Sequence, residues 1–180
     1  MKFAEINGLI NAKSGEEAFS WLITRHNSFS RMETLLSAKE FMQWRVFYKA
    51  LGLIWTISDN IYNHKLVLHD IFSNTTKYQL NLMMEPNERT TLKSMPLTFP
   101  IYRGCYSKSR NGFSWSIDRK VAEGFTLLHR YKKVGDSRLL LEAKVNRSNA
   151  ILKLDREEFE IITTKIIEPI KTLDLSKCVE

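Results

Sequence analysis

Three short segments of the chain bring together residue types that could do chemistry. In the first, Arg103 follows an extended stretch and precedes the flexible Gly104. A guanidinium at the end of a strand can present its planar fork of N–H donors to a phosphate or a carboxylate. A surface arginine paired with a neighbouring carboxylate has the same local sequence, so this segment alone does not select a function.

The second segment is Ser114-Trp115-Ser116. Successive side chains of a strand point to opposite faces, so the two hydroxyls are expected to share one face while Trp115 takes the other. Hydroxyls placed in this way could bind a sugar or a phosphate. Solvated serines at a strand edge are the alternative interpretation.

The third segment is Glu158-Phe159-Glu160. The same alternation predicts that both carboxylates emerge on one face and that Phe159 points to the other. Two like charges this close repel each other unless cationic or hydroxyl groups accompany them. The pair is therefore either a solvated edge or part of a site that supplies such partners.

In their order along the chain, the three segments resemble the arginine, Ser-x-Ser and Glu-x-Glu motifs of the arginine–serine–glutamate class of ADP-ribosyltransferases. The matching stretches are 101–104, 112–125 and 158–162, and the central one is the most specific. Together the three stretches look like a pattern of small phage and bacterial proteins with this fold. Two features differ from the classical toxins of the class: only ten residues separate Arg103 from Ser114, and Trp115 occupies the place of the usual threonine.

The resemblance implies that NAD binds in a cleft between two small sheets, and it assigns a role to each motif. Arg103 would hold the phosphates or the adjoining ribose, and Ser114 would order the nicotinamide ribose and the catalytic glutamate. Glu160 would bind the ribose 2′-hydroxyl and stabilise the oxocarbenium ion formed as nicotinamide leaves, as carboxylates do in glycosidases. Glu158 would orient and help deprotonate the acceptor, and a glutamate there goes with arginine acceptors.

The remaining motif residues complete the expected cofactor site. Gly104 and Ser116 are expected beside NAD. The nicotinamide ring needs an aromatic or apolar wall, for which Tyr102, Trp115 and Phe125 are candidates, with core packing as the alternative for Phe125. No metal is implied, and the spacing of the histidines is not that of metal ligands; they are His26, His64, His69 and His129.

We therefore expect a mono-ADP-ribosyltransferase that transfers ADP-ribose from NAD to a macromolecule, with protein arginine as the favoured acceptor and nucleic acid as the alternative. An NAD glycohydrolase differs only in that water takes the ribosyl group. A catalytically silent binding module of the same fold is the alternative outside enzymes. An RNA-directed phosphotransferase of related fold would call for histidine and arginine where this chain has serine and glutamate.

The charge distribution favours a phosphate-bearing partner. The chain carries a formal net charge of +7, and residues 103–147 hold 11 basic side chains against four acidic ones. A basic excess concentrated in this way attracts phosphates. A solvated basic face without a specific ligand is the alternative.

Helices are expected to fill residues 1–96. Ser14 and Ser30 each begin an S-x-x-E capping box, a signature of a helix start. Apolar residues at three- and four-residue spacings predict a helix from the second box to Gly52, where glycine would end it, and a further helix over much of 53–72. Pro86 is expected to begin a shorter helix.

Residues 97–180 are expected to be rich in strands, so the chain as a whole is predicted to be one compact α+β domain. Alternating apolar residues and turn signals predict strands at 98–103, 113–116, 138–145, 150–154, 159–164 and 170–173. A helix is expected from Asp118 to Tyr131, with Val121, Phe125 and Leu128 facing inward. The resemblance implies that these strands form two small, mostly antiparallel sheets with the helical region packed on them.

Length and composition exclude several classes of protein. With 180 residues, 43% of them hydrophobic, the chain can bury a core, and it lacks the apolar run of about 18 residues that a membrane helix needs. Glu5 stands where a signal peptide would be apolar, so a cytoplasmic location is expected, which is the host cytoplasm if a phage encodes the protein. Cys105 and Cys178 are expected to be free thiols.

Overall fold

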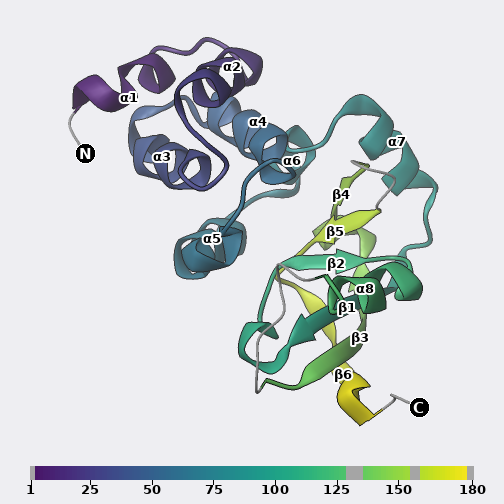
Figure 1. Ribbon diagram of the computed structural model, residues 1–180. Helices are drawn as coiled ribbons and strands as arrows, with labels where there is room; N and C mark the ends of the chain where they lie inside the picture. The colour runs from purple at the N-terminus through teal and green to yellow at the C-terminus, as the bar shows by residue number, and fades with distance from the viewer. Residues whose placement is uncertain (1–2, 129–135, 155–158, 178–180) are drawn as a thin grey trace. The chain divides into compact units, whose positions relative to one another are not determined.

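A computed structural model describes residues 3–128, 136–154 and 159–177 of the chain (Figure 1). The chain divides into two compact units, Met1–Glu85 and Pro86–Glu180. From the sequence we predicted that the helical region ends at residue 96. In the structure the second unit begins at Pro86, so helix α7 (Pro86–Ser94) belongs with the strands that follow it. Its Glu88 forms an ion pair with Lys153 of strand β4, and these contacts make α7 part of the second unit.

The first unit is entirely helical over its described residues. Helix α4 is central to it and packs against α2, α3 and α6. The α-helices are α1 (Phe3–Ile10), α2 (Gly15–Arg25), α3 (Arg31–Ala38), α4 (Trp44–Trp55), α5 (Lys65–Ser73) and α6 (Lys77–Leu82), with 3₁₀ turns η1 (Lys39–Phe41) and η2 (Ile61–His64). The core of the unit includes fully buried side chains of α4, such as Leu51, Ile54 and Trp55.

The single helix predicted from the second capping box to Gly52 is wrong, because the chain forms α3, η1 and α4 there, and α4 continues through Gly52 to Trp55. A Cβ atom on Gly52 would lie 2.0 Å from the carbonyl oxygen of Met83. The glycine is therefore needed where the chain after α6 passes close to α4. The helix predicted over 53–72 is interrupted at Asn60, which has a left-handed backbone (φ 60°).

The two predicted capping boxes have different outcomes. Ser14 caps α2 by accepting the N–H of Glu17, although the Glu17 carboxylate accepts from Lys13 instead of from Ser14. Ser30 makes no side-chain cap to α3, so that prediction is wrong. Asn27 takes over there, because its side-chain oxygen accepts the N–H of Ser30 at 3.1 Å.

A complete capping box occurs at α6, where the sequence analysis did not predict one. The Thr76 hydroxyl accepts the N–H of Gln79, and the Gln79 side chain accepts the N–H of Thr76. This reciprocal pair satisfies two backbone donors at the start of a helix of six residues.

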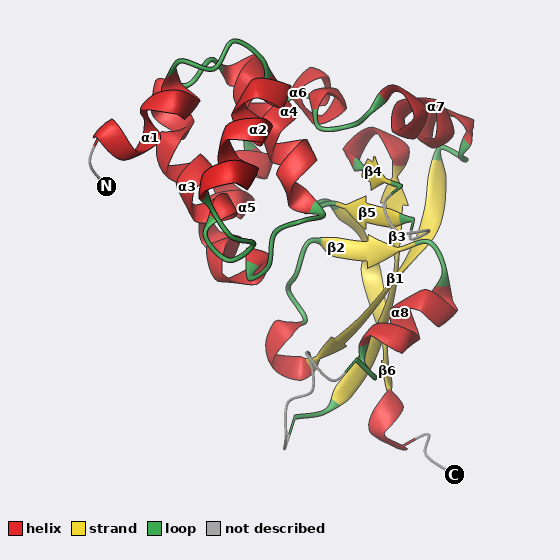
Figure 2. Cartoon of the chain, turned by 45° about the horizontal axis from the view of Figure 1, so that its top comes forward, coloured by secondary structure: helices red, strands yellow, loops and turns green. Residues whose placement is uncertain are grey.

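The second unit is built on a six-stranded antiparallel sheet, which confirms the α+β class (Figure 2). The strand order is β4-β5-β2-β1-β3-β6. The strands are β1 (Thr98–Tyr106), β2 (Ser114–Ser116), β3 (Arg138–Asn146), β4 (Ile151–Lys153), β5 (Glu160–Ile162) and β6 (Ile166–Asp174), with helix α8 (Arg119–Phe125) and 3₁₀ turns η3 (Ser107–Ser109), η5 (Arg147–Asn149) and η6 (Leu175–Lys177).

The described strands form one sheet, where the resemblance implied two. The pairing between strands is nevertheless short in the middle of the sheet. Strands β1 and β3 pair along nine residues, whereas β1 and β2 share one register pair, Tyr102 with Ser116. Strand β2 takes the rest of its pairing from β5, so the sheet consists of a short part (β4, β5, β2) and a long part (β1, β3, β6) joined at that pair.

The alternation predicted for 138–145 is confirmed on one face of the sheet. The side chains of Leu139, Leu141, Ala143 and Val145 are buried, and their register partners on β1 include Phe99 and Ile101, which are buried as well. Leu140 is also buried, although the sequence pattern assigned it to the polar face.

Helix α8 lies against β1 and begins where the sequence predicted (Figures 1 and 2). The Asp118 carboxylate accepts the N–H groups of Lys120 and Val121 and so caps the helix. The α-helix ends at Phe125, and part of the predicted extension to Tyr131 falls outside the described residues. The predicted inward stripe is only partly correct, because the fully buried side chain is Ala122 and Leu128 is 40% exposed.

Candidate functional site

The sheet brings residues of all three motifs onto adjacent strands. Ser116 of β2 lies opposite Tyr102 of β1 on one side and opposite Glu160 of β5 on the other. Directly opposed residues of an antiparallel sheet project from the same face, with Cβ atoms about 4.5–5.5 Å apart. The motif segments, which are up to 58 positions apart in the sequence, therefore present Tyr102, Ser116 and Glu160 side by side.

This line of neighbours extends to both edges of the sheet. We call it the cross-strand row. It runs from β6 to β4 through Lys171, Glu142, Tyr102, Ser116, Glu160 and Lys153. Charged or polar groups thus occupy the whole width of this face at one level, while the neighbouring positions on the opposite face are largely apolar and buried.

Arg103 is held by backbone carbonyl groups. Its Nη1 donates to the carbonyl oxygen of Ser114 at 2.5 Å and its Nη2 to that of Ser109 at 3.0 Å. The guanidinium lies so close to Gly112 that a Cβ there would be 2.0 Å from Nη2. Arg103 therefore connects β1 to β2 and to the intervening loop, beside the single register pair that joins these strands. Its predicted contact with a cofactor phosphate stays a prediction.

The loop between β1 and β2 has a second anchor at Asp136. This carboxylate accepts hydrogen bonds from the Ser107 hydroxyl and from the N–H of Lys108. The bond from Ser107 is the main cause of a pKa for Asp136 below its ordinary value. Arg103 of β1 and Asp136, which precedes β3, therefore both hold this loop.

The two serines of the second motif have different surroundings. Ser116 is buried, and its hydroxyl accepts the N–H of Asp118 at 3.0 Å, which orients the start of α8. Ser114 is half-buried, lies two residues along the same strand, and so shares the face of the cross-strand row. Of the two hydroxyls on the face of Glu160, that of Ser114 is the more accessible, although its register partner is Ile162.

The aromatic residues Tyr102 and Trp115 lie on opposite faces of the sheet. Trp115 is 5% exposed, lies opposite Ile161, and points away from the cross-strand row, which favours a packing role over the predicted contact with nicotinamide. Tyr102 is half-buried and belongs to the row itself. Of these two candidates for an aromatic wall, only Tyr102 lies on the face of Glu160.

Gly104 serves the packing of α8. A Cβ atom there would lie 1.7 Å from the carbonyl oxygen of Ala122. The absent side chain lets the helix approach β1 closely. The buried Tyr106 hydroxyl reinforces this approach by donating to the carbonyl oxygen of Thr126 at 3.1 Å. Phe125, the last residue of α8, is half-buried.

Two ion pairs that we did not predict from the sequence lie next to these residues. The first joins Arg119 of α8 to Glu142 of the row, with 2.9 Å between Nη1 of Arg119 and the Glu142 carboxylate. Nε of the arginine donates to Glu123, and this bond is the main cause of a raised pKa for Arg119. The i, i+4 spacing of Arg119 and Glu123 was a usable sequence signal for an exposed ion pair, but not for the contact with β3.

The second is the ion pair between Lys153 and Glu88. The Lys153 ammonium lies 2.9 Å from the Glu88 carboxylate, and both side chains are 6% exposed. Glu88 also accepts the N–H of Leu154 at 3.0 Å. Lys153 is the register partner of Glu160, so this buried pair adjoins the third motif.

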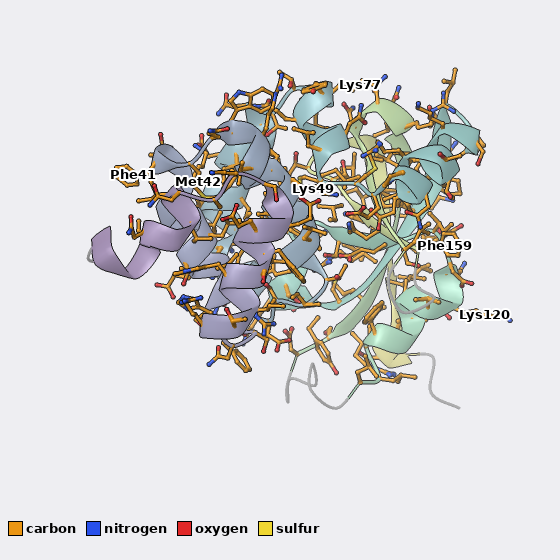
Figure 3. The ribbon with its side chains drawn as sticks, turned by 90° about the horizontal axis from the view of Figure 1, so that it is seen from above. Phe41, Met42, Lys49, Lys77, Lys120 and Phe159 are labelled. Atoms are coloured by element: carbon orange, nitrogen blue, oxygen red, sulfur yellow. The ribbon has the colours of Figure 1, made fainter. Side chains whose placement is uncertain are left out.

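Glu158 lies outside the described residues, so its predicted place on the face of Glu160 stays a prediction. Phe159, between the two glutamates, is 40% exposed (Figure 3). Lys120 projects outward from α8 (Figure 3). Cys105 is a buried free thiol whose pKa is raised by burial, whereas Cys178 falls outside the described residues.

Within the described part of the chain, histidine, cysteine and carboxylate side chains do not gather in any group of three or more suited to a metal ion. None of the helices described is long and apolar enough to cross a membrane. Comparisons with protein-family models, with curated proteins and with solved structures gave no match. The functional assignment therefore rests on the residues of this chain.

Proposed function

We propose that this protein is a mono-ADP-ribosyltransferase that transfers ADP-ribose from NAD to a macromolecular acceptor, with a protein arginine as the favoured acceptor. One observation carries the proposal. Ser116 stands between Tyr102 and Glu160 in the cross-strand row, so motifs that are distant in the sequence meet on three adjacent strands. The row itself is polar, although buried apolar side chains such as Leu140 and Ile162 lie beside it on the same face, and Trp115 points away from it.

The chemistry assigned to Glu160 follows from its charge. When the bond between ribose and nicotinamide breaks, its electron pair leaves with nicotinamide and positive charge develops on the ribose. A carboxylate held at that point stabilises the oxocarbenium ion, and a preorganised group needs no rearrangement as the charge appears. In this proposal the half-buried Ser114 hydroxyl hydrogen-bonds to the nicotinamide ribose or to Glu160, and Tyr102 contacts the nicotinamide ring.

Arg103 has a supporting part in this proposal. By donating to the carbonyl oxygen of Ser114, it sets the position of β2 relative to β1. Arg103 alternates with Tyr102 along β1 and so projects from the opposite face of the sheet, and its assignment to a phosphate of NAD follows from the resemblance alone. The nearby basic side chains of 103–147 would attract the same phosphates.

The proposal is tested by incubating the protein with NAD labelled in its adenylate part and with an arginine-rich protein. Release of nicotinamide and transfer of label are measured in parallel. Glu160→Gln keeps the shape of the side chain but loses its charge, so both reactions should fall by at least about 10²-fold. Glu33→Gln, which alters an exposed residue of α3 in the first unit, is the control and should match wild type.

Glu158→Gln separates transfer from hydrolysis. If Glu158 activates the acceptor, this variant should lose arginine labelling and keep nicotinamide release, because water needs less help than a guanidinium whose pKa exceeds 12. Nicotinamide release without any labelling by wild type would indicate a glycohydrolase. If wild type neither releases nicotinamide nor binds NAD, the proposal fails and a binding module takes its place.

A further inference from the structure

The ion pair of Lys153 and Glu88 is the most deeply buried pair of opposite charges among the described residues, and its place beside Glu160 suggests a role beyond holding α7. Both residues are at most 5% exposed as whole residues. Burying an ion pair is costly, and well-packed apolar side chains of the same volume would often serve the fold equally well. The position of the pair therefore calls for a further explanation.

The geometry places the lysine next to the proposed catalytic carboxylate. Lys153 and Glu160 are register partners on β4 and β5 and so project from the same face, with Cβ atoms about 4.5–5.5 Å apart. The Lys153 ammonium donates to the carboxylate of Glu88. Glu88 lies in the first turn of α7, where the helix dipole favours a negative charge.

Helix α7 is fixed at both of its ends, so the pair has a defined position. At the start of the helix, Glu88 accepts from Lys153 and from the N–H of Leu154. At its end, Arg147 donates to the carbonyl oxygens of Lys93 and Met95 at 2.5 and 2.6 Å.

We propose that Lys153 is a positioning residue that holds the Glu160 side chain in its charged form, and that Glu88 limits the strength of this effect. The proposal rests on the proposed function in that Glu160 must be the carboxylate that serves the reaction. A cation next to a carboxylate favours ionisation, and a second carboxylate opposes it. The other charged or titratable groups on this face are Tyr102, Glu142, Lys144 and Lys171, together with Arg119 of α8, which pairs with Glu142.

The sign of the effect differs for the two partners. If Lys153 is neutralised, the Glu88 carboxylate is left near Glu160, and the like charges favour protonation of Glu160. If Glu88 is neutralised, the full charge of Lys153 acts on Glu160 and favours ionisation. A pair that only holds α7 in place would give no such opposite shifts.

The experiment measures the ionisation of Glu160 directly. The whole protein is labelled with ¹³C-glutamate, the side-chain carboxyl signal of Glu160 is identified by its loss in Glu160→Gln, and its titration is followed by NMR. In Lys153→Gln the midpoint should rise by about one pH unit, and in Glu88→Gln it should fall by about as much. The double variant and Lys153→Arg should lie close to wild type.

Lys171→Gln is the matched control, because Lys171 is an exposed lysine at the far edge of the same row and should leave the midpoint unchanged. The pH dependence of nicotinamide release should follow the NMR: its acidic limb moves up in Lys153→Gln and down in Glu88→Gln. The NMR readout needs no NAD, so a protein without activity would refute the proposed function and still test this one. Shifts in the same direction for both single variants, or no shift in Glu88→Gln, would overturn the inference. If Lys153→Gln does not fold, Glu88→Gln decides alone, since its amide oxygen can still accept from Leu154.

Discussion

The close approach of α8 to β1 makes the stability of the second unit depend on Gly104. In Gly104→Ala the added Cβ would lie 1.7 Å from the carbonyl oxygen of Ala122 and 3.1 Å from Thr126 Cγ2. The first contact is with backbone, which cannot rotate away as a side chain could. To reach 3.0 Å, the helix must move from the strand by about 1.3 Å.

That movement strains specific interactions. It draws Thr126 away from the buried Tyr106 hydroxyl, a bond of 3.1 Å. Overpacking costs about 1–3 kcal/mol and the lost hydrogen bond about 1 kcal/mol, so the free energy of unfolding should fall by about 2–4 kcal/mol. Each kcal/mol lowers the melting temperature of a unit of this size by about 4–8 °C.

The matched control is Gly124→Ala in the same helix. A Cβ at Gly124 meets nothing within 4 Å. Alanine is the better helix former by about 0.8–1.0 kcal/mol, so this variant should be as stable as wild type or more so. Thermal and urea unfolding of the full chain measure both changes. If Gly104→Ala unfolds like wild type, or if Gly124→Ala is the less stable of the two, the close packing described for α8 is incorrect.

Two further predictions concern Arg103 and His26. In Arg103→Lys, an ammonium cannot hold the carbonyl oxygens of Ser109 and Ser114 as the planar guanidinium does. The free energy of unfolding measured in urea should therefore fall by about 1–2 kcal/mol, and nicotinamide release should fall with it. Weaker NAD binding at unchanged stability would instead mean that Arg103 acts mainly on the cofactor. Burial lowers the pKa of His26, with Arg25 and Arg31 adding to the effect. The folded state therefore binds the proton of His26 less readily than the unfolded state does. The stabilisation contributed by neutral His26 is complete at pH values above the ordinary histidine pKa and declines as the pH falls below that value. Melting temperatures of wild type and His26→Gln between pH 7.5 and 5 should show a smaller decline in the variant, and parallel curves would contradict this origin.

Local signals in the sequence predicted much of the second unit. The alternation over 138–145, the cap at Asp118 and the helix start at Pro86 all depend on neighbours within a few residues, and all three are present in the structure. The arrangement within the second motif was accessible in the same way. Alternation on a short strand places Ser114 and Ser116 on one face whatever their partners are.

Features that depend on distant partners could not be read in this way. Gly52 looks like a helix stop, and only the chain around Met83 explains why the helix needs a glycine there. The Lys153–Glu88 pair joins residues 65 positions apart, and neither has a local signature. Ser30 has the right spacing to Glu33 for a capping box, yet the Asn27 side chain accepts the N–H of Ser30 that the Glu33 side chain would accept in such a box.

The single register pair between β1 and β2 has a consequence for how this protein could vary. The alignment of Ser116 with Glu160 is set by β5, since β2 pairs with it along all three of its residues. Insertions or deletions in the loop between β1 and β2 would therefore leave the register of Ser116 with Glu160 unchanged. Under the proposed function, a library of loop lengths at this point would vary the surroundings of the substrate while keeping the proposed catalytic carboxylate in register with Ser116, which makes this loop a place for engineering.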